Sequence, residues 1–165
     1  MGTVVCDTGP ILHLREAGSL DLLSKIGRVF IPRMVDAELA EIDDSWKGQR
    51  PSWISVETLS PAESSQAEAI HSSGLLNAGE AEAIILARRL GVDWLLTDDT
   101  AARVFANAIG LEVHGSLGLV LWTAAVGYLQ YAETKLAIDR LAQSSLWVSQ
   151  AILEKACKAL EEICG

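Results

Sequence analysis

The sequence predicts an α/β protein, a three-layer α/β/α fold with a central, mostly parallel sheet and further helices at the C-terminus. Short apolar runs alternate with helical patterns up to about residue 113, which is the order expected of a parallel sheet with helices on both faces. These runs are nearly continuous in apolar residues, as strands buried on both faces are. The 165 residues contain no internal repeat or long linker, so we expect a single domain.

The first predicted strand, residues 3–6, is a β-branched run that ends at Asp7. Turn residues follow it, and Pro10 suits the first position of a short helix. A second helix over residues 20–26 leads to an apolar strand over residues 29–31. Asp7 is therefore expected at the end of a buried strand.

An amphipathic helix follows the second strand. Val35, Leu39 and Ile42 repeat at the i, i+4, i+7 spacing of one helix face. Glu38 falls inside this apolar stripe, so it is expected to face the sheet. The polar composition of residues 43–51 then predicts a loop.

Two capping boxes mark the starts of the next two helices. Residues 53–59 alternate like a strand, and Ser60 with Glu63 forms the capping box of a polar helix. Asn77 with Glu80 forms the second box, which opens the helix at the centre of the chain.

This central helix ends at Gly91 and carries two acids near its start. At 100° per residue, Glu80 shares a face with the small and apolar residues of the helix, whereas Glu82 lies about 200° away from it. Glu80 is therefore the acid that is expected to point toward the protein.

A strand over residues 93–97 follows and ends at Asp98 and Asp99. Ligands of open α/β sheets bind at the carboxyl ends of the strands. Beyond these acids we expect a helix over residues 100–109 and a strand over 111–113. The rest of the chain predicts three helices.

Five acids thus occupy positions where burial is expected, at strand ends or on the inner faces of helices: Asp7, Glu38, Glu80, Asp98 and Asp99. A buried carboxylate without a partner is costly, and no Lys or Arg accompanies these acids at a fixed spacing. Each acid alone has a simpler interpretation as a turn residue, a helix cap or a solvated helix position. Their convergence on one sheet edge instead favours an all-oxygen site for Mg²⁺ or Mn²⁺.

Composition argues against several other classes of protein. The net charge of −9 argues against binding nucleic acid by bulk electrostatics. Cys6, Cys157 and Cys164 lack metal-ligand spacing, so we expect reduced structural thiols and no zinc site. No apolar run reaches the ~18 residues of a membrane span, and no signal-peptide pattern is present. We therefore expect a soluble, cytoplasmic protein.

Four short motifs, in this order and spacing, resemble the PIN-domain family. They are VVCDTGP at residues 4–10, Glu38, GEAEA at residues 79–83 and LLTDD at residues 95–99. The resemblance is greatest to the branch of VapC-type toxins (DUF3368-like PIN domains) and covers about residues 3–125. Residues 114–118 also resemble the glycine-containing turn after the last strand of that branch. One departure is Glu80, because many relatives carry Asp at this position.

The resemblance implies a PIN-like fold and a Mg²⁺- or Mn²⁺-dependent endoribonuclease, the toxin of a type II toxin–antitoxin pair. It implies a nuclease core over about residues 1–125 and additional helices over about 126–165 of one PIN-like domain. The implied catalytic acids are Asp7, Glu38, Glu80 and Asp99, with Asp98 as a further candidate, and Thr8 and Thr97 match small hydroxyl positions that support them.

The mechanism that these residues support is hydrolysis of a phosphodiester by a metal-activated water, with one or two ions. Asp7 and Asp99 are the predicted principal ligands, with Asp98 as an alternative to Asp99. Glu80 would be a ligand directly or through water, and Glu38 a ligand or the group that orients the attacking water. The family implies that cleavage leaves a 5′-phosphate. The alternative function is a PIN-like protein-binding or scaffold module without nuclease activity.

Arginines and tryptophans are candidates for contacts with an RNA substrate. Six arginines could contact the RNA backbone: Arg15, Arg33, Arg50, Arg88, Arg89 and Arg103. The alternative for each of them is a solvated position on the surface without a role in binding. The five tryptophans could stack on bases, but the apolar neighbours of Trp94 and Trp122 predict core positions. The three histidines are scattered along the sequence and predict no site.

We also expect a homodimer that a protein antitoxin restrains. The helix after Ser116 is apolar nearly all round, and surplus apolar surface usually marks an interface. The alternative is that the two last helices bury it. An inhibiting partner would reach the acidic cleft with a basic side chain such as Arg.

Overall fold

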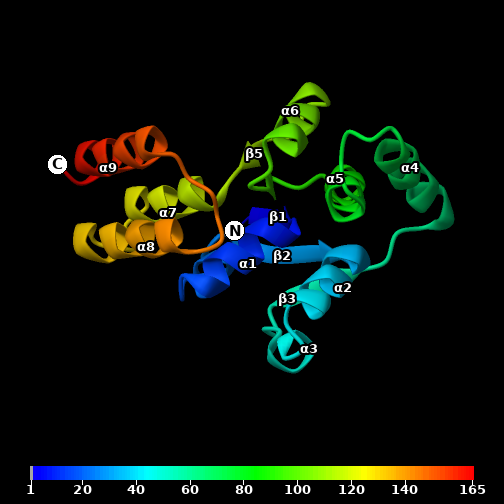
Figure 1. Cartoon of the computed structure of the whole chain (residues 1–165), viewed down its shortest axis with the longest axis horizontal. Coiled ribbons are helices and arrows are strands. Elements are labelled where there is room, and N and C mark those ends of the chain that lie inside the picture. Colours follow the sequence, from blue (N-terminus) through cyan, green and yellow to red (C-terminus); the bar gives the residue numbers. More distant parts are fainter. Residues whose placement is uncertain (1) are drawn as a thin grey trace.

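The computed structural model describes residues 2–165 and has a five-stranded sheet in which every neighbouring pair of strands is parallel. The strand order is β3-β2-β1-β4-β5, and helices cover both faces (Figure 1). The predicted three-layer α/β/α fold is therefore confirmed. The strands are β1 (Gly2–Cys6), β2 (Gly27–Pro32), β3 (Ile54–Glu57), β4 (Trp94–Leu96) and β5 (Val113–His114).

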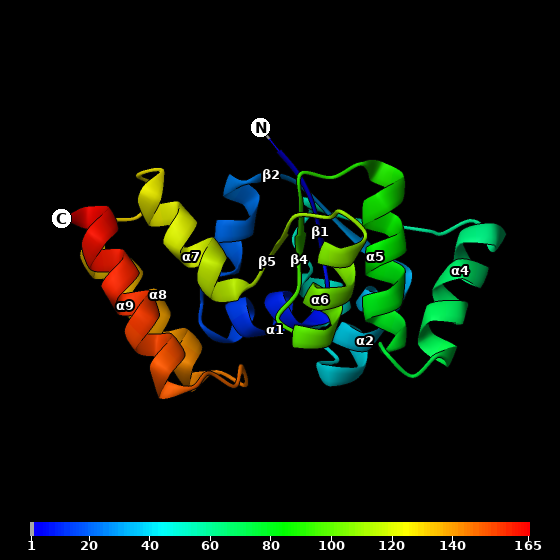
Figure 2. The same ribbon diagram turned by 90° about the horizontal axis from the view of Figure 1, so that it is seen from above.

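The helices follow the strands in alternation up to β5 and then form a C-terminal group. Figures 1 and 2 show α7, α8 and α9 gathered at one end of the molecule and α4 at the other. The helical elements are α1 (Thr8–Glu16), the 3₁₀ helix η1 (Leu20–Lys25), α2 (Arg33–Ile42), α3 (Trp46–Gln49), α4 (Pro61–Ser72), α5 (Ala78–Leu90), α6 (Thr100–Ala108), α7 (Ser116–Ala125), α8 (Tyr131–Gln143) and α9 (Gln150–Cys164).

The central strand β1 contributes to two apolar cores, one on each face of the sheet. Val4 and Cys6 belong to the core beneath α1, α7 and α8, whereas Val5 belongs to the core beneath α5 and α6. All three side chains are fully buried. Because successive residues of a strand point to opposite faces, burial on both sides explains why the strands have nearly continuous apolar sequences.

Both predicted capping boxes are present. At the start of α5, Asn77 Oδ1 accepts from the Glu80 N–H at 2.8 Å, and Glu80 Oε2 accepts from the Asn77 N–H at 3.0 Å. Gly91 ends this helix with a φ of 60°, a conformation that is costly for residues with a Cβ. Ser60 and Glu63 make the equivalent pair at α4.

Two predictions about local structure were wrong. Residues 43–51 are not entirely a loop, because α3 forms within them around Trp46, which is fully buried and donates from Nε1 to Asp36 Oδ1 at 2.8 Å. This anchor is a tertiary contact that the polar composition does not reveal. The last strand lies at Val113–His114 and not at 111–113, because its pairing with β4 begins at Val113, opposite Leu95.

The apolar helix α7 is largely covered by the chain itself. Its Leu119 and Val120 are fully buried, as are Ile138 and Leu141 of α8 and Leu160 of α9 that pack in the same core. The apolar excess of α7 is thus used mainly within the molecule, and the two following helices do bury it. The C-terminal helices share their core with β1 and do not form a core of their own.

Two further findings concern the thiols and the length of the helices. Cys6 is buried, Cys157 is half-buried and Cys164 is exposed, and all three are free. The expectation of a structural thiol therefore fails for Cys164.

Within residues 2–165, no helix combines the length and the apolar character that crossing a membrane would need.

Candidate active site

Five acids from four separate segments line one cavity of about 460 Å³ at the carboxyl edge of the sheet: Asp7, Glu38, Glu80, Asp98 and Asp99. Asp7 follows β1 and Asp99 follows β4, which is the neighbour of β1 in the sheet. Glu38 comes from α2 and Glu80 from the first turn of α5. The parallel sheet therefore brings together side chains that are up to 92 positions apart in the sequence, from Asp7 to Asp99.

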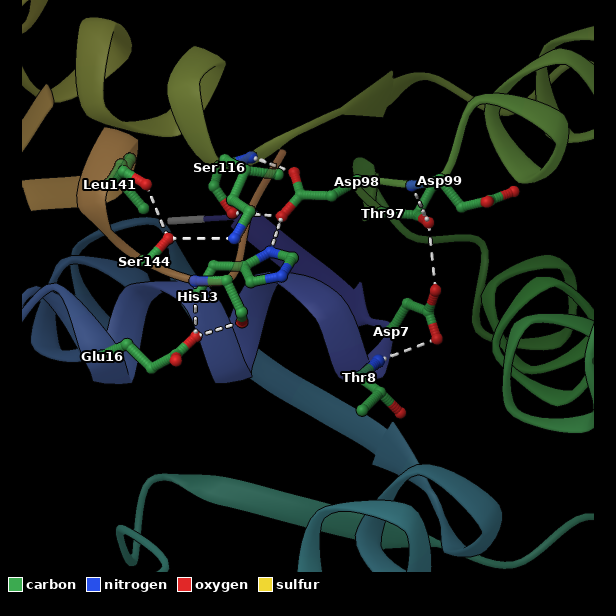
Figure 3. A network of polar contacts seen from close by, with 12 residues as sticks. Asp7, Thr8, His13, Glu16, Thr97, Asp98, Asp99, Ser116, Leu141 and Ser144 are labelled. Atoms are coloured by element: carbon green, nitrogen blue, oxygen red, sulfur yellow. Dashed lines mark hydrogen bonds and ion pairs between the residues drawn. The ribbon is translucent and has the colours of Figure 1, made fainter. Parts of the chain in front are cut away.

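Asp7 is the most deeply placed of these acids, with 5 % of its surface exposed. Its Oδ1 accepts from the Thr8 N–H at 2.7 Å, and its Oδ2 accepts from Thr97 Oγ1 at 3.0 Å, as Figure 3 shows. Burial raises the pKa of the Asp7 carboxyl to about 7, and the charges of Glu80 and Glu38 add to this, while the Thr8 and Thr97 hydrogen bonds oppose it. Asp7 is therefore a carboxylate that a nearby cation would stabilise in its charged form.

Glu38 is held by two groups from different helices. Its Oε2 accepts from Thr8 Oγ1 at 2.5 Å, and its Oε1 accepts from the Gly79 N–H at 3.1 Å. A Cβ atom at position 79 would lie only 2.5 Å from Glu38 Oε2. Gly79 thus has a specific reason to be glycine, because any larger residue would displace the Glu38 carboxylate.

Glu80 both caps a helix and lines the cavity. Its Oε2 accepts from the Asn77 N–H in the capping box, and 9 % of its surface is exposed. Burial raises the pKa of Glu80, and the charges of Asp99 and Glu38 raise it further, against the lowering effect of the Asn77 hydrogen bond. Glu80 is therefore a helix cap whose side chain also lies at the cavity.

Asp99 is the exposed member of the set, contrary to the expectation of burial. It is the N-cap of α6, where its Oδ2 accepts from the Ala102 N–H at 2.8 Å. Its own N–H donates to Thr97 Oγ1 at 3.3 Å, and the same hydroxyl donates to Asp7. Thr97 thus connects the two acids that follow the neighbouring strands.

Asp98 points away from Asp99 and has a different environment (Figure 3). Its Oδ2 lies 2.7 Å from His13 Nδ1 and accepts from Ser116 Oγ at 2.6 Å, and its Oδ1 accepts from the Ser116 N–H at 2.7 Å. Although burial acts to raise it, the pKa of Asp98 is lowered by these hydrogen bonds. Because both of its oxygens contact protein groups, Asp98 fastens the loop after β4 to α1 and α7.

Sequence reasoning missed His13 and Ser116 as members of this network. His13 lies four residues after Gly9 on the same helix, and its ring carbon would be 3.5 Å from a Cβ at position 9. No local signal pairs His13 with Asp98, because the two residues lie 85 positions apart in the sequence. Ser116 could have been found as the first residue of the helix that follows the last strand.

The donor set of the cavity fits a divalent cation in its chemistry. Its acids offer oxygen atoms, which Mg²⁺ and Mn²⁺ prefer, and no Lys or Arg is among the described residues that line it. In residues 2–165, however, no three Asp, Glu, His or Cys side chains already stand close enough together to hold an ion. Asp7, Glu38, Glu80 and Asp99 are the residues that would hold one.

Glu82, the acid of α5 that was expected to point away from Glu80, does not line the cavity, and its Oε1 accepts from the Met34 N–H at 3.4 Å. The arginines that were candidates for RNA contacts differ in position. Arg103 lies beside Asp98, with 3.6 Å between its nitrogen and Oδ1, whereas Arg15, Arg50 and Arg89 pair with acids elsewhere.

The tryptophans also differ in position. Trp94 and Trp122 pack edge to face with their ring centroids 5.4 Å apart, and both lie against the core. Trp46 is fully buried. Trp147 is exposed and lines the acidic cavity, so it is the tryptophan that the structure places at the site.

Comparison with known proteins identifies a family that covers most of the chain. The model of a family described as a PIN domain (DUF3368) matches residues 3–162. No curated protein and no solved structure matches the chain. PIN domains are generally nucleases, and an acidic cavity at the carboxyl edge of a parallel sheet suits that chemistry. With nearly its whole length matched, the chain belongs to the PIN-domain family.

Proposed function

We propose that this protein is a metal-dependent endoribonuclease that hydrolyses phosphodiester bonds in RNA. The observation that carries the proposal is the cavity lined by Asp7, Glu38, Glu80 and Asp99 without a lysine or arginine among its described lining residues. Burial and the charges of neighbouring acids raise the pKa of Asp7 and of Glu80, and buried acids without a compensating cation are costly to the fold. A site that binds a divalent ion and a phosphate gives a reason to keep them.

The residues divide into ligands and supporting groups. Asp7 and Asp99 are the principal ligands of Mg²⁺ or Mn²⁺ in this proposal, and Glu80 is a ligand directly or through water. Thr97 holds Asp7 and the backbone of Asp99 in place. Asp98 is a positioning residue, since His13 and Ser116 occupy its oxygens.

In this proposal Glu38 acts on the attacking water or on the metal ion. Thr8 and Gly79 fix the orientation of its carboxylate at the cavity, so it orients the water or serves as a further ligand. A bound Mg²⁺ or Mn²⁺ would supply the acidification of that water and the neutralisation of the phosphate. Cleavage of this type would leave a 5′-phosphate, as the family resemblance implies.

The test is cleavage of a labelled single-stranded RNA in Mg²⁺ or Mn²⁺. Wild type should cleave, excess chelator should stop cleavage, and Asp7→Asn or Asp99→Asn should reduce the rate by about 100-fold or more, since loss of a few kcal/mol of transition-state stabilisation has this effect. Glu82→Gln is the matched control on the same helix as Glu80 and should cleave like wild type. Equal rates for wild type and Asp7→Asn would refute the proposal.

The second candidate is a PIN-like protein-binding or scaffold module without nuclease activity. One observation favours it, because each of the four acids already accepts a hydrogen bond from a backbone N–H at the start of a helix: Asp7, Glu38, Glu80 and Asp99. These acids would then serve the fold alone. Absence of cleavage together with a melting temperature that Mg²⁺ and Mn²⁺ leave unchanged would support this candidate.

We propose further that the protein acts as the toxin of a type II toxin–antitoxin pair and is a homodimer restrained by a protein partner. Exposed apolar side chains on the C-terminal helices support an interface there: Tyr131, Leu136, Ile152 and Ile163. A basic side chain of the partner would suit the acidic cavity. Light scattering, with and without the product of any adjacent small gene, tests this, and a monomer that no such product binds or inhibits would contradict it.

A further inference from the structure

Trp147 is an unusual residue for its position. Its surface is 86 % exposed, the largest value among the large apolar side chains of residues 2–165. It lies in the segment of residues 144–149 between α8 and α9, and it lines the same cavity as the acids. An exposed indole at the edge of the acidic cavity is available to contact a ligand that binds there.

The segment that carries Trp147 is anchored on both sides. Ser145 donates from its N–H and its hydroxyl to Glu16 Oε1 of α1, and the Leu146 N–H donates to Ser144 Oγ at 3.2 Å. Leu146 packs against the core, and Ser149 caps α9. The backbone that carries the indole is therefore anchored before any ligand arrives, which lowers the entropy cost of ordering this segment on binding.

Trp147 stands between the acidic cavity and a second cavity of about 440 Å³. The two cavities share four lining residues: Asp98, Thr100, Leu146 and Trp147. Both volumes lie in the roughly 300–1,000 Å³ range of small-molecule sites. A polymer bound over the acids would therefore continue directly past the indole into the second cavity.

The second cavity differs from the first in charge. Arg103 and His114 line it, and Asp98 is its single acidic lining residue among those described. Arg103 is fixed there, because its Nε donates to the Thr97 carbonyl at 2.9 Å and its guanidinium lies beside Asp98. Gly115 leaves the room for this guanidinium, since a Cβ at position 115 would clash with it. A phosphate is therefore better accommodated in this cavity than among the four acids.

We propose that Trp147 and Arg103 form a nucleotide-binding subsite that adjoins the acidic cavity. An unpaired base stacks on the indole, a phosphate next to it contacts Arg103, and the following phosphodiester is thereby placed over Asp7 and Asp99. Stacking needs a free base face, so the subsite selects single-stranded over duplex RNA. This inference rests on the proposed nuclease function and names the form of its substrate.

The experiment compares Trp147→Ala with two matched variants in cleavage of a short single-stranded RNA. Trp147→Ala should raise KM by roughly 5- to 150-fold, the range of one base–aromatic stacking interaction, and change kcat by less than about twofold. Trp147→Phe should keep most of the affinity. Tyr128→Ala, which removes another exposed aromatic side chain, should behave like wild type. Because Trp147 is so exposed, its truncation leaves the fold intact, and circular dichroism verifies this.

A second measurement separates this inference from the nuclease function. The fluorescence anisotropy of a labelled single-stranded RNA measures its binding to Asp7→Asn and to the double variant Asp7→Asn/Trp147→Ala. The measurement reports binding and does not depend on cleavage. Weaker binding by the double variant supports the subsite even if wild type proves inactive. If wild type cleaves RNA and Trp147→Ala changes neither KM nor binding, the subsite is refuted but the nuclease function is not. The exposed indole would then be a contact for a protein partner. Absence of both cleavage and Trp147-dependent binding overturns both proposals.

Discussion

Replacing Asp7 with Asn should stabilise the metal-free protein even though it removes a proposed metal ligand. Asp7 is buried, and burial together with the charges of Glu80 and Glu38 raises its pKa from 3.8 to about 7. The unfolded chain has no such environment, so its carboxyl keeps a pKa near 3.8. Folding at neutral pH therefore forces an acid into a place where its charged form is disfavoured.

The sign and size of the effect follow from proton linkage. Between pH 3.8 and about 7 the unfolded chain loses a proton that the folded protein keeps, so the free energy of unfolding falls as pH rises. One pKa unit corresponds to 1.36 kcal/mol. The wild type thus loses about 1.6 kcal/mol by pH 5 and about 4 kcal/mol by pH 8, whereas Asn does not titrate. The stability advantage of Asp7→Asn should grow by about 2.5 kcal/mol from pH 5 to pH 8.

Urea unfolding followed by circular dichroism measures this difference. Chelator must be present at both pH values, because a metal that binds only the folded wild type would mask the effect. Asp44→Asn removes an exposed carboxylate and should show no comparable change with pH. An Asp7→Asn variant that is no more stable than wild type at pH 8, or whose advantage does not grow with pH, would refute the reasoning.

Three further predictions concern the surroundings of the acids. Gly79→Ala should favour helix formation locally but displace the Glu38 carboxylate, so kcat should fall by about 100-fold with the fold retained. The control in the same cleavage assay is Gly118→Ala, where a Cβ meets only distant atoms. Mn²⁺ or Mg²⁺ at about 100 times Kd should raise the wild-type melting temperature by roughly 5–10 °C, and an unchanged value would argue against a metal site. Asp98→Ala should lower the free energy of unfolding by about 2–4 kcal/mol, because Ser116 and His13 lose their partner; a change below about 1 kcal/mol in urea titration would contradict it.

Local signals were sufficient to predict the architecture. Apolar runs ending at Asp7 and Asp98 located the two central strands, and the pair Asn77 and Glu80 located the start of α5. These signals are local because capping and strand burial depend on residues a few positions apart. The convergence of the acids then followed from the parallel order of the strands, which places their carboxyl ends at one edge.

Features that depend on contacts between distant residues could not be predicted from the sequence. The helix around Trp46 forms because the indole is buried and bonded to Asp36, and nothing in residues 43–51 alone indicates this. The different environments of Asp98 and Asp99 are set by His13 and Ser116, which lie 85 and 18 residues from Asp98. The place of Trp147 at the cavity likewise depends on how α8 packs on α1 and how α9 packs on α8.

The central claim is that the acids at the carboxyl edge of the sheet hold a divalent ion for hydrolysis. Anomalous scattering from crystals soaked in Mn²⁺ tests it most directly, because it locates the ion without relying on activity. We predict a peak within direct coordination distance of Asp7 and Asp99, near Glu80 and Glu38, that is lost in crystals of Asp7→Asn. Absence of a peak in this cavity at a saturating Mn²⁺ concentration, or one that persists unchanged in Asp7→Asn, would contradict the claim.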